Sequence, residues 1–126
     1  SSARLHCVVG CGGDRDKGKR AMVGEVAMRL ADAVIFTSDN PRTEDPLSII
    51  KDITAGAGAN SYQIEIDRAL AIYQAIDNAQ SGDIVLIAGK GHEEFQEIKG
   101  RKIPFKDAEI VQQVLQDLAM KVRAQE

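Results

Sequence analysis

A glycine-rich segment near the amino terminus, residues 10–20 (GCGGDRDKGKR), carries the densest group of residues that could bind an anion. It fits two phosphate-binding patterns incompletely. Arg15 stands where G-x-G-x-x-G needs its third glycine, and Arg20 replaces the hydroxyl residue that should follow G-x-x-x-x-G-K. Backbone N–H groups, a helix N-terminus and cationic side chains nevertheless favour an anion. The alternative is a solvated turn without a ligand. The cations are Arg15, Lys17, Lys19 and Arg20.

A second polar segment, residues 38–46 (SDNPRTEDP), predicts a stiff turn. Pro41 fixes its own φ angle and keeps Asn40 out of the helical region, so Asn40 and Arg42 are presented from a defined backbone. A guanidinium held in this way suits a carboxylate, because its fork of donors matches the two oxygens. The alternative is an ordinary β-turn in which Arg42 pairs locally.

The third segment, residues 89–94 (GKGHEE), contains two glycines that let a ligand approach the backbone. Glu93 could bind a cationic group there. His92 has no nucleophile near it in the sequence, so an ordinary hydrogen-bonded loop histidine is favoured over a general base.

Together the three segments complement a zwitterion such as an amino acid. Arg15 and Arg42 suit carboxylates, Asn40 offers hydrogen bonds, and Glu93 with the Gly89 carbonyl suits an ammonium group. The sequence shows no nucleophile–base set, metal-ligand cluster or complete phosphate loop. It therefore predicts a domain that binds a substrate but does not transform it alone.

The elements that position these segments alternate between β-branched runs and amphipathic stretches. This alternation predicts an α/β fold: a Rossmann-like, doubly wound, mostly parallel sheet flanked by helices, with a small hairpin near the carboxy-terminal end. The most apolar run, residues 83–88, is expected to be buried on both faces. Loops at the carboxyl ends of such strands share one crevice. The expected strands are 5–9, 33–37, 62–66 and 83–88, the hairpin 95–104, and the helices 19–31, 46–57 (capped by Asp45), 68–79 (capped by Asp67) and from 107 onward.

Composition narrows the functional classes. A chain of 126 residues fits one domain, and its net charge of -3 provides no cationic field for nucleic acid or anionic lipid. No apolar run suits a membrane span or a signal peptide, so a cytoplasmic location is expected. Cys7 and Cys11 are too far apart on an extended strand for a disulfide, which predicts free thiols, and they do not form a zinc signature.

Three stretches in this order resemble the carboxy-terminal domain of the Mur ligases of peptidoglycan synthesis: GCGGDRDKGKR, TSDNPRTEDP and LIAGKGHEEFQ. The resemblance covers essentially the whole chain, residues 1–126. It implies an ATP-dependent, Mg²⁺-requiring amide ligase, in which a substrate carboxylate becomes an acyl phosphate that an incoming amine attacks. It also implies that this domain holds the amino acid and closes over a central ATPase domain, while other domains bind the UDP-N-acetylmuramoyl-dipeptide.

The resemblance extends to individual residues. The run from Asp39 to Arg42 matches the motif associated with meso-diaminopimelate. Lysine-adding relatives have a similar motif without the arginine. Ala21 replaces a proline that is usual in the family, and the UDP-sugar and ATPase domains are absent, which predicts an excised domain. The alternative is a non-catalytic, Rossmann-like nucleotide or amino-acid binding module. The implied substrate-binding residues are Arg15, Asp39, Asn40, Pro41, Arg42, Gly89 and Glu93, and Asp16, Lys17 and Lys19 are expected to face ATP.

Overall fold

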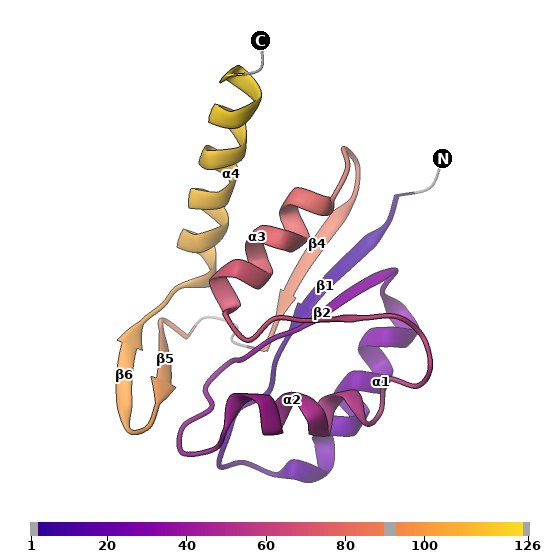
Figure 1. Cartoon of the computed structure of the whole chain (residues 1–126), viewed down its shortest axis with the longest axis vertical. Coiled ribbons are helices and arrows are strands. Elements are labelled where there is room, and N and C mark those ends of the chain that lie inside the picture. Colours follow the sequence, from indigo (N-terminus) through magenta and orange to yellow (C-terminus); the bar gives the residue numbers. More distant parts are fainter. Residues whose placement is uncertain (1–2, 90–92, 125–126) are drawn as a thin grey trace.

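A central sheet with two helices on each face organises the chain in the computed structural model, which describes residues 3–89 and 93–124 (Figure 1). The strands are β1 (Leu5–Val9), β2 (Ala33–Phe36), β3 (Gln63–Ile64) and β4 (Ile84–Ala88), with a separate hairpin of β5 (Phe95–Ile98) and β6 (Arg101–Pro104). The helices are the 3₁₀ helix η1 (Lys17–Lys19) and the α-helices α1 (Arg20–Leu30), α2 (Pro46–Thr54), α3 (Arg68–Asn78) and α4 (Asp107–Ala124).

The main sheet is parallel, with strand order β3-β2-β1-β4. Val9 pairs with both Phe36 and Ala88, so the carboxyl ends of β1, β2 and β4 lie at one edge of the sheet. One hydrophobic cluster joins the sheet to α1 and α2, and a second joins its opposite face to α3 and α4 (Figure 1). The predicted doubly wound α/β fold is confirmed.

Local sequence chemistry accounts for where the helices begin. The Asp45 carboxylate accepts a hydrogen bond from the Leu47 N–H, and the Asp67 carboxylate accepts one from the Leu70 N–H, so both predicted caps are confirmed. The hairpin is also confirmed; at its turn Lys99 and Gly100 both have positive φ angles, 50° and 79°.

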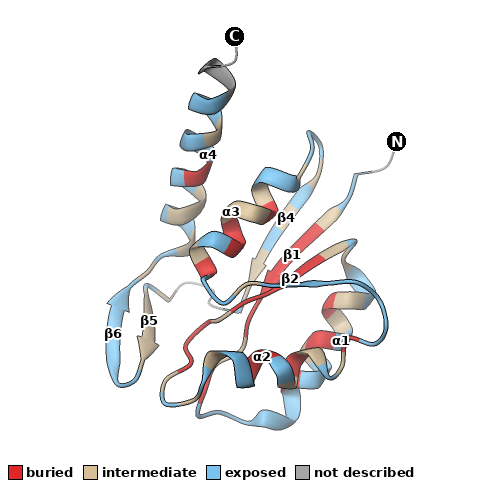
Figure 2. Ribbon diagram, viewed as in Figure 1, coloured by how far each residue is buried: buried red, intermediate tan, exposed pale blue. Residues whose placement is uncertain are grey.

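The prediction that residues 83–88 are buried on both faces is wrong. β4 is an outermost strand of the sheet, and Ile84 and Leu86 are 62% and 49% exposed (Figure 2). Leu86 lies on the sheet face that α1 covers, but α1 packs over β1 and β2. The result is an apolar groove of about 360 Å³ between the strand and helix residues such as Met22 and Leu30.

Two other predicted elements are shorter in the structure. The strand expected at 62–66 consists of Gln63–Ile64, because beyond it the chain turns and the Ile66 carbonyl accepts a hydrogen bond from the Ser38 hydroxyl. The helix expected at 46–57 ends at Thr54, and beyond its end Gly56 packs against α1, where a Cβ would lie 1.8 Å from the Ala21 carbonyl oxygen.

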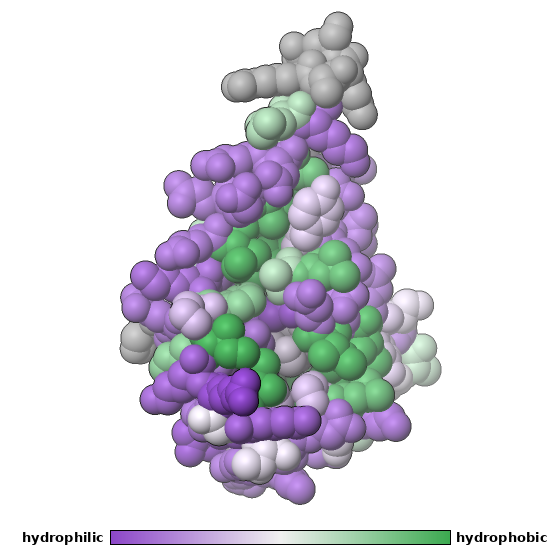
Figure 3. Space-filling model, turned by 60° about the vertical axis from the view of Figure 1, so that its left-hand side comes forward, coloured by the Kyte–Doolittle hydropathy of each residue, from purple (hydrophilic) through white to green (hydrophobic). Residues whose placement is uncertain are grey.

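The surface over α4 and the hairpin mixes hydrophobic patches with hydrophilic side chains (Figure 3). Along α4, Val114 is buried against α3, whereas the adjacent Leu115 is 53% exposed. Of the helices described, none has both the length and the apolar character that crossing a membrane requires.

Cys7 and Cys11 are free thiols, as predicted, and burial raises the pKa of both.

Candidate functional site

The loops that follow β1, β2 and β4 meet at the carboxyl edge of the sheet with their backbones in direct contact. A Cβ on Gly10 would lie 2.5 Å from the Thr37 carbonyl oxygen. A Cβ on Gly89, whose φ is +109°, would lie 2.6 Å from the Gly10 carbonyl oxygen. Distances this short exclude any side chain. These glycines therefore allow the three loops to pack together, which brings the three predicted segments to one place.

The glycine-rich loop packs against the second loop along its length. The Gly13 N–H donates a hydrogen bond of 2.7 Å to the Asn40 carbonyl, and a Cβ on Gly13 would lie 1.9 Å from the Pro41 carbonyl oxygen. The Asp16 carboxylate accepts a hydrogen bond from the Gly18 N–H at the start of η1. The structure thus uses these glycines for backbone packing, and the protein's own carboxylate occupies the helix N-terminus that the sequence assigned to an anion.

One of the four cations in this loop is buried rather than presented to a ligand. Arg20 begins α1 and is 1% exposed. Its guanidinium makes two hydrogen bonds to the Glu44 carboxylate, at 2.9 and 3.0 Å, one of 3.0 Å to Asp52 and one of 3.0 Å to the Gly12 carbonyl. Arg20 therefore joins the first loop, the second loop and α2.

Glu44 and Asp14 complete the contact between the first two loops. The Glu44 carboxylate accepts a hydrogen bond of 2.7 Å from the Asp14 N–H, and the Thr43 hydroxyl donates one of 2.6 Å to the Asp14 carboxylate. The Arg20 hydrogen bonds, followed by the Asp14 N–H, lower the pKa of Glu44 from 4.5 to about 2. Glu44 is thus held as a carboxylate over the whole ordinary pH range.

The second loop presents Asn40 and Arg42 differently. Asn40 is 1% exposed; its Oδ1 accepts a hydrogen bond from the Glu97 N–H, and its Nδ2 donates one of 3.3 Å to Glu93. Asn40 thereby connects the second loop to β5 and to the segment that precedes it. The predicted proximity of Asn40 and Glu93 is present in the structure.

Arg42 sits in left-handed backbone, with φ +54°, and pairs in register with Ile98 of the hairpin. Its Nη1 donates a hydrogen bond of 2.9 Å to the Gly13 carbonyl, and its Nε lies 3.6 Å from the Glu97 carboxylate. Among the described residues, none accepts a hydrogen bond from its Nη2. The alternative expected from the sequence, local pairing of Arg42, thus applies to Nε and Nη1. The Nη2 edge is not used in this pairing.

Arg15 and Arg42 come together beside Gly12. A Cβ on Gly12 would lie 2.8 Å from Arg42 Nη1 and 3.6 Å from Arg15 Cγ, so both side chains border the same glycine. Arg15 is exposed, and the described residues offer it no hydrogen bond or ion pair. The structure therefore places the Arg42 guanidinium and the Arg15 side-chain stem beside the same glycine.

The other predicted residues have mixed positions. Lys17 and Lys19 are exposed on η1, and Lys17 Nζ lies 3.9 Å from Glu44. Asp39 is buried beside Asn40, and the Asp39 carbonyl accepts a hydrogen bond of 2.8 Å from Gln96. His92, named in the sequence as a loop histidine, lies outside the described residues.

Sequence reasoning missed a second buried arginine at this edge. Arg68 begins α3, and its guanidinium makes two hydrogen bonds of 2.8 Å to Asp107 at the start of α4. It also donates to the Ser38 and Ala88 carbonyls, at 3.2 and 3.4 Å. An arginine directly after a helix cap, followed by an apolar helix, was the only available signal, because its partner lies 39 positions away.

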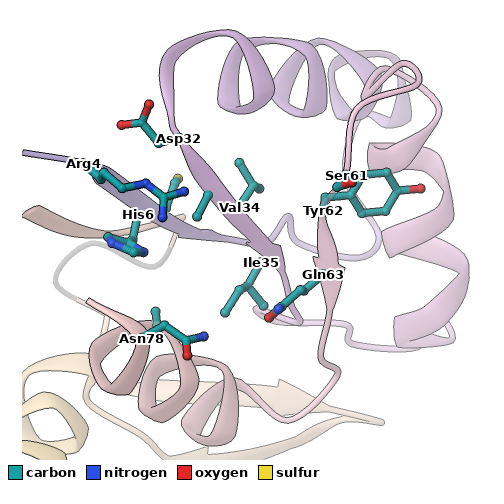
Figure 4. A pocket seen from close by; sticks show the side chains of 12 residues that line it. Arg4, His6, Asp32, Val34, Ile35, Ser61, Tyr62, Gln63 and Asn78 are labelled. Atoms are coloured by element: carbon teal, nitrogen blue, oxygen red, sulfur yellow. The ribbon is translucent and has the colours of Figure 1, made fainter. Parts of the chain in front are cut away.

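A larger cavity lies at the opposite, amino-terminal edge of the sheet. It measures about 430 Å³ and opens between Arg4 and His6 on one side and Ser61 to Gln63 on the other (Figure 4). His6 is 4% exposed and lies 2.9 Å from the Asp83 carboxylate. The N–H groups of Gln80 and Arg4, and then His6, lower the pKa of Asp83 to about 2.

Comparisons with known proteins agree on one family. A family model described as "Mur ligase, glutamate ligase domain" matches residues 1–91. A protein of Nitrosomonas europaea named UDP-N-acetylmuramoyl-L-alanyl-D-glutamate--2,6-diaminopimelate ligase is 59% identical over 119 residues, 94% of this chain and 23% of that protein. A protein of the same name from Synechococcus elongatus is 61% identical over 106 residues, 83% of this chain and 21% of its own.

A solved structure gives the same result in three dimensions. It is titled as the structure of a ligase of that name, and it superimposes with a TM-score of 0.88 at 45% sequence identity over 94% of this chain and 25% of its own. The chain spans about a quarter of the length of the curated relatives it matches.

Proposed function

The chain belongs to the Mur ligase family, and we propose from this that it is the carboxy-terminal, amino-acid-binding domain of an ATP-dependent amide ligase. In this proposal the ligase adds meso-diaminopimelate to UDP-N-acetylmuramoyl-L-alanyl-D-glutamate in the cytoplasm, as a step of peptidoglycan synthesis. The observation that carries the proposal is the convergence of Arg15 and Arg42 on Gly12, beside the contact between Asn40 and Glu93.

The cationic side of the site suits the two carboxylates of meso-diaminopimelate. The Arg42 guanidinium is oriented by the Gly13 carbonyl and Glu97, and its Nη2 edge is left to bind a carboxylate oxygen. Arg15 is exposed next to it and can reach the same ligand. Lysine lacks the distal carboxylate, so it would leave a guanidinium of the site without its partner. Such a loss is a strong source of discrimination.

The acidic side of the site suits an ammonium group. Glu93 is half-buried and already accepts a hydrogen bond from the Asn40 amide, which fixes one of its oxygens. The Gly89 carbonyl offers a second acceptor, from the loop that packs against Gly10. We propose that these two residues meet the distal amine, and that Asp39 and Pro41 hold the turn that carries Asn40 and Arg42.

ATP and Mg²⁺ are proposed to bind mainly to the other domains of the ligase. Lys17 and Lys19 are exposed cations that suit phosphate oxygens, whereas Asp16 is engaged at the start of η1. Over the described ranges 3–89 and 93–124, no group of three or more His, Cys, Asp or Glu side chains could hold a metal ion. The nucleotide would supply the activation of the substrate carboxylate. This domain would supply neither nucleophile nor base, so we expect the isolated chain to be inactive.

A ligation assay on the full-length protein that contains this chain tests the proposal. With the UDP-sugar dipeptide, meso-diaminopimelate, ATP and Mg²⁺, mass spectrometry should detect the dipeptide extended by one diaminopimelate residue. Phosphate release should require the amino acid, and the isolated chain should release none. Tight ATP binding without an amino-acid-dependent product would instead support a non-catalytic nucleotide-binding module and contradict the proposal.

A further inference from the structure

We propose that Arg20 is a positioning residue for substrate recognition: through Glu44 and Gly12 it holds the loop that carries Arg15 at a fixed distance from the loop that carries Arg42. This inference rests on the proposed function. It gives Arg20 a role that differs from those of the other three cations in its loop, which are exposed.

The geometry places Arg20 beneath the point where the two carboxylate-binding arginines meet. Its Nη2 donates a hydrogen bond of 3.0 Å to the carbonyl of Gly12, the residue that both Arg15 and Arg42 border. The same nitrogen donates one of 2.9 Å to Glu44 in the second loop. A single nitrogen atom therefore connects the two loops.

Glu44 extends this connection back into the first loop. Its carboxylate accepts hydrogen bonds from both nitrogens of the Arg20 fork and from the Asp14 N–H, directly before Arg15. Arg42 in turn donates to the Gly13 carbonyl. A shift of the backbone at Gly12 and Gly13 would therefore displace both the Arg15 side chain and the acceptor that orients the Arg42 guanidinium.

The arrangement requires a guanidinium rather than a general positive charge. Arg20 uses its two terminal nitrogens on Glu44, Asp52 and a carbonyl at once, while its buried Nε has no hydrogen-bond partner among the described residues. A lysine ammonium would retain the charge but not the paired, planar geometry. Misplacement of a binding group by about 1 Å can lower a rate by about a hundredfold.

The test is steady-state kinetics of the full-length ligase carrying Arg20→Lys or Glu44→Gln. The KM for meso-diaminopimelate should rise about tenfold to a hundredfold and by more than the KM for ATP, while the KM for the UDP-sugar dipeptide stays unchanged. Glu44→Gln retains the size of the side chain and one acceptor oxygen, so it decides the question if Arg20→Lys does not fold.

Asp83→Asn is the matched control. It weakens a buried, hydrogen-bonded pair at the opposite edge of the sheet, so it should lower the thermal unfolding midpoint without changing any KM. Equal changes in all three KM values, a wild-type KM for diaminopimelate in Glu44→Gln, or the same KM change in Asp83→Asn would overturn the inference. A wild-type enzyme with no diaminopimelate-dependent activity would instead refute the proposed function.

Discussion

The two edges of the sheet both contain a carboxylate that is hydrogen-bonded to a buried basic side chain, yet they are built differently. At the carboxyl edge, three loops pack backbone to backbone and two buried arginines, Arg20 and Arg68, connect them. At the amino edge, the His6–Asp83 pair lies beside the 430 Å³ cavity, which is lined by strand residues such as Val34 and Gln63. The pKa of a carboxylate is lowered to about 2 at both edges. Neither a large cavity nor a shifted pKa therefore identifies the candidate site, whereas the convergence of positioned polar groups does.

The largest expected effect is on the choice of amino acid. Arg42→Ala in the full-length ligase should remove most of the preference for meso-diaminopimelate over L-lysine, because a site that must bind a polar group can discriminate by about 10⁴ to 10⁵. The preference of the Arg42→Lys enzyme should lie between those of the wild type and Arg42→Ala, since lysine retains the charge but loses the paired donors of the guanidinium. Competition between the two amino acids measures the ratio. A wild-type ratio in Arg42→Ala would place specificity elsewhere.

The next effect concerns the packing of the loops. Gly13→Ala should lower the free energy of unfolding by about 3 kcal/mol, near the upper end for overpacking, because its Cβ would lie 1.9 Å from the Pro41 carbonyl oxygen. Gly18→Ala in the same loop meets only the end of the Asp16 side chain, at 3.2 Å, and should be nearly neutral. Urea unfolding of the two variants checks this, and equal losses would contradict the close packing described.

A smaller effect is expected from Arg15, which is exposed. Arg15→Ala should lower kcat/KM for meso-diaminopimelate by about ten- to hundredfold, or about 1.5 to 3 kcal/mol, the range for hydrogen bonds to charged groups. Arg29→Ala removes another exposed arginine, from α1, and serves as the control. A folded and fully active Arg15→Ala enzyme would contradict a role in binding and support the alternative, a solvated turn without a ligand.

The smallest effect is on acid stability. Because folding lowers the pKa of Glu44 from 4.5 to about 2, its stabilising contribution is complete above pH 4.5 and is lost as the pH falls toward 2. Glu44→Gln should flatten the dependence of the unfolding midpoint on pH in this window. Asp83→Asn should likewise flatten this dependence between pH 3.8 and about pH 2, because the pKa of Asp83 is lowered from 3.8 to about 2. The two edges should thus respond alike to acid and differently in substrate binding, and an unchanged pH profile in either variant would contradict the hydrogen bonds assigned to that carboxylate.

The sequence predicted the elements well where their causes are local. Strands with β-branched runs and helices capped by Asp45 and Asp67 follow from nearby residues. The exposure of β4 could not be predicted in this way, because an apolar strand has the same sequence pattern whether or not a helix covers it. How far its side chains are exposed depends on where α1 lies relative to the strand.

The candidate site was predictable in its composition but not in its internal contacts. The convergence of the three loops follows from the parallel sheet, and it placed Arg15 near Arg42. The partners of Arg20 lie 24 and 32 positions away, so its burial could not be separated from the exposure of Lys17 and Lys19. The same holds for the glycines, which could serve a ligand or a neighbouring backbone and here serve the latter.

Competition between meso-diaminopimelate and L-lysine in the wild-type, full-length ligase is the most direct test of a site built for two carboxylates. With both amino acids at equal concentration, and ATP and the UDP-sugar dipeptide in excess, mass spectrometry gives the ratio of the two products. The account predicts product that contains almost entirely diaminopimelate. Comparable amounts of the lysine product would contradict it, because the convergence of Arg15 and Arg42 would then contribute nothing to recognition.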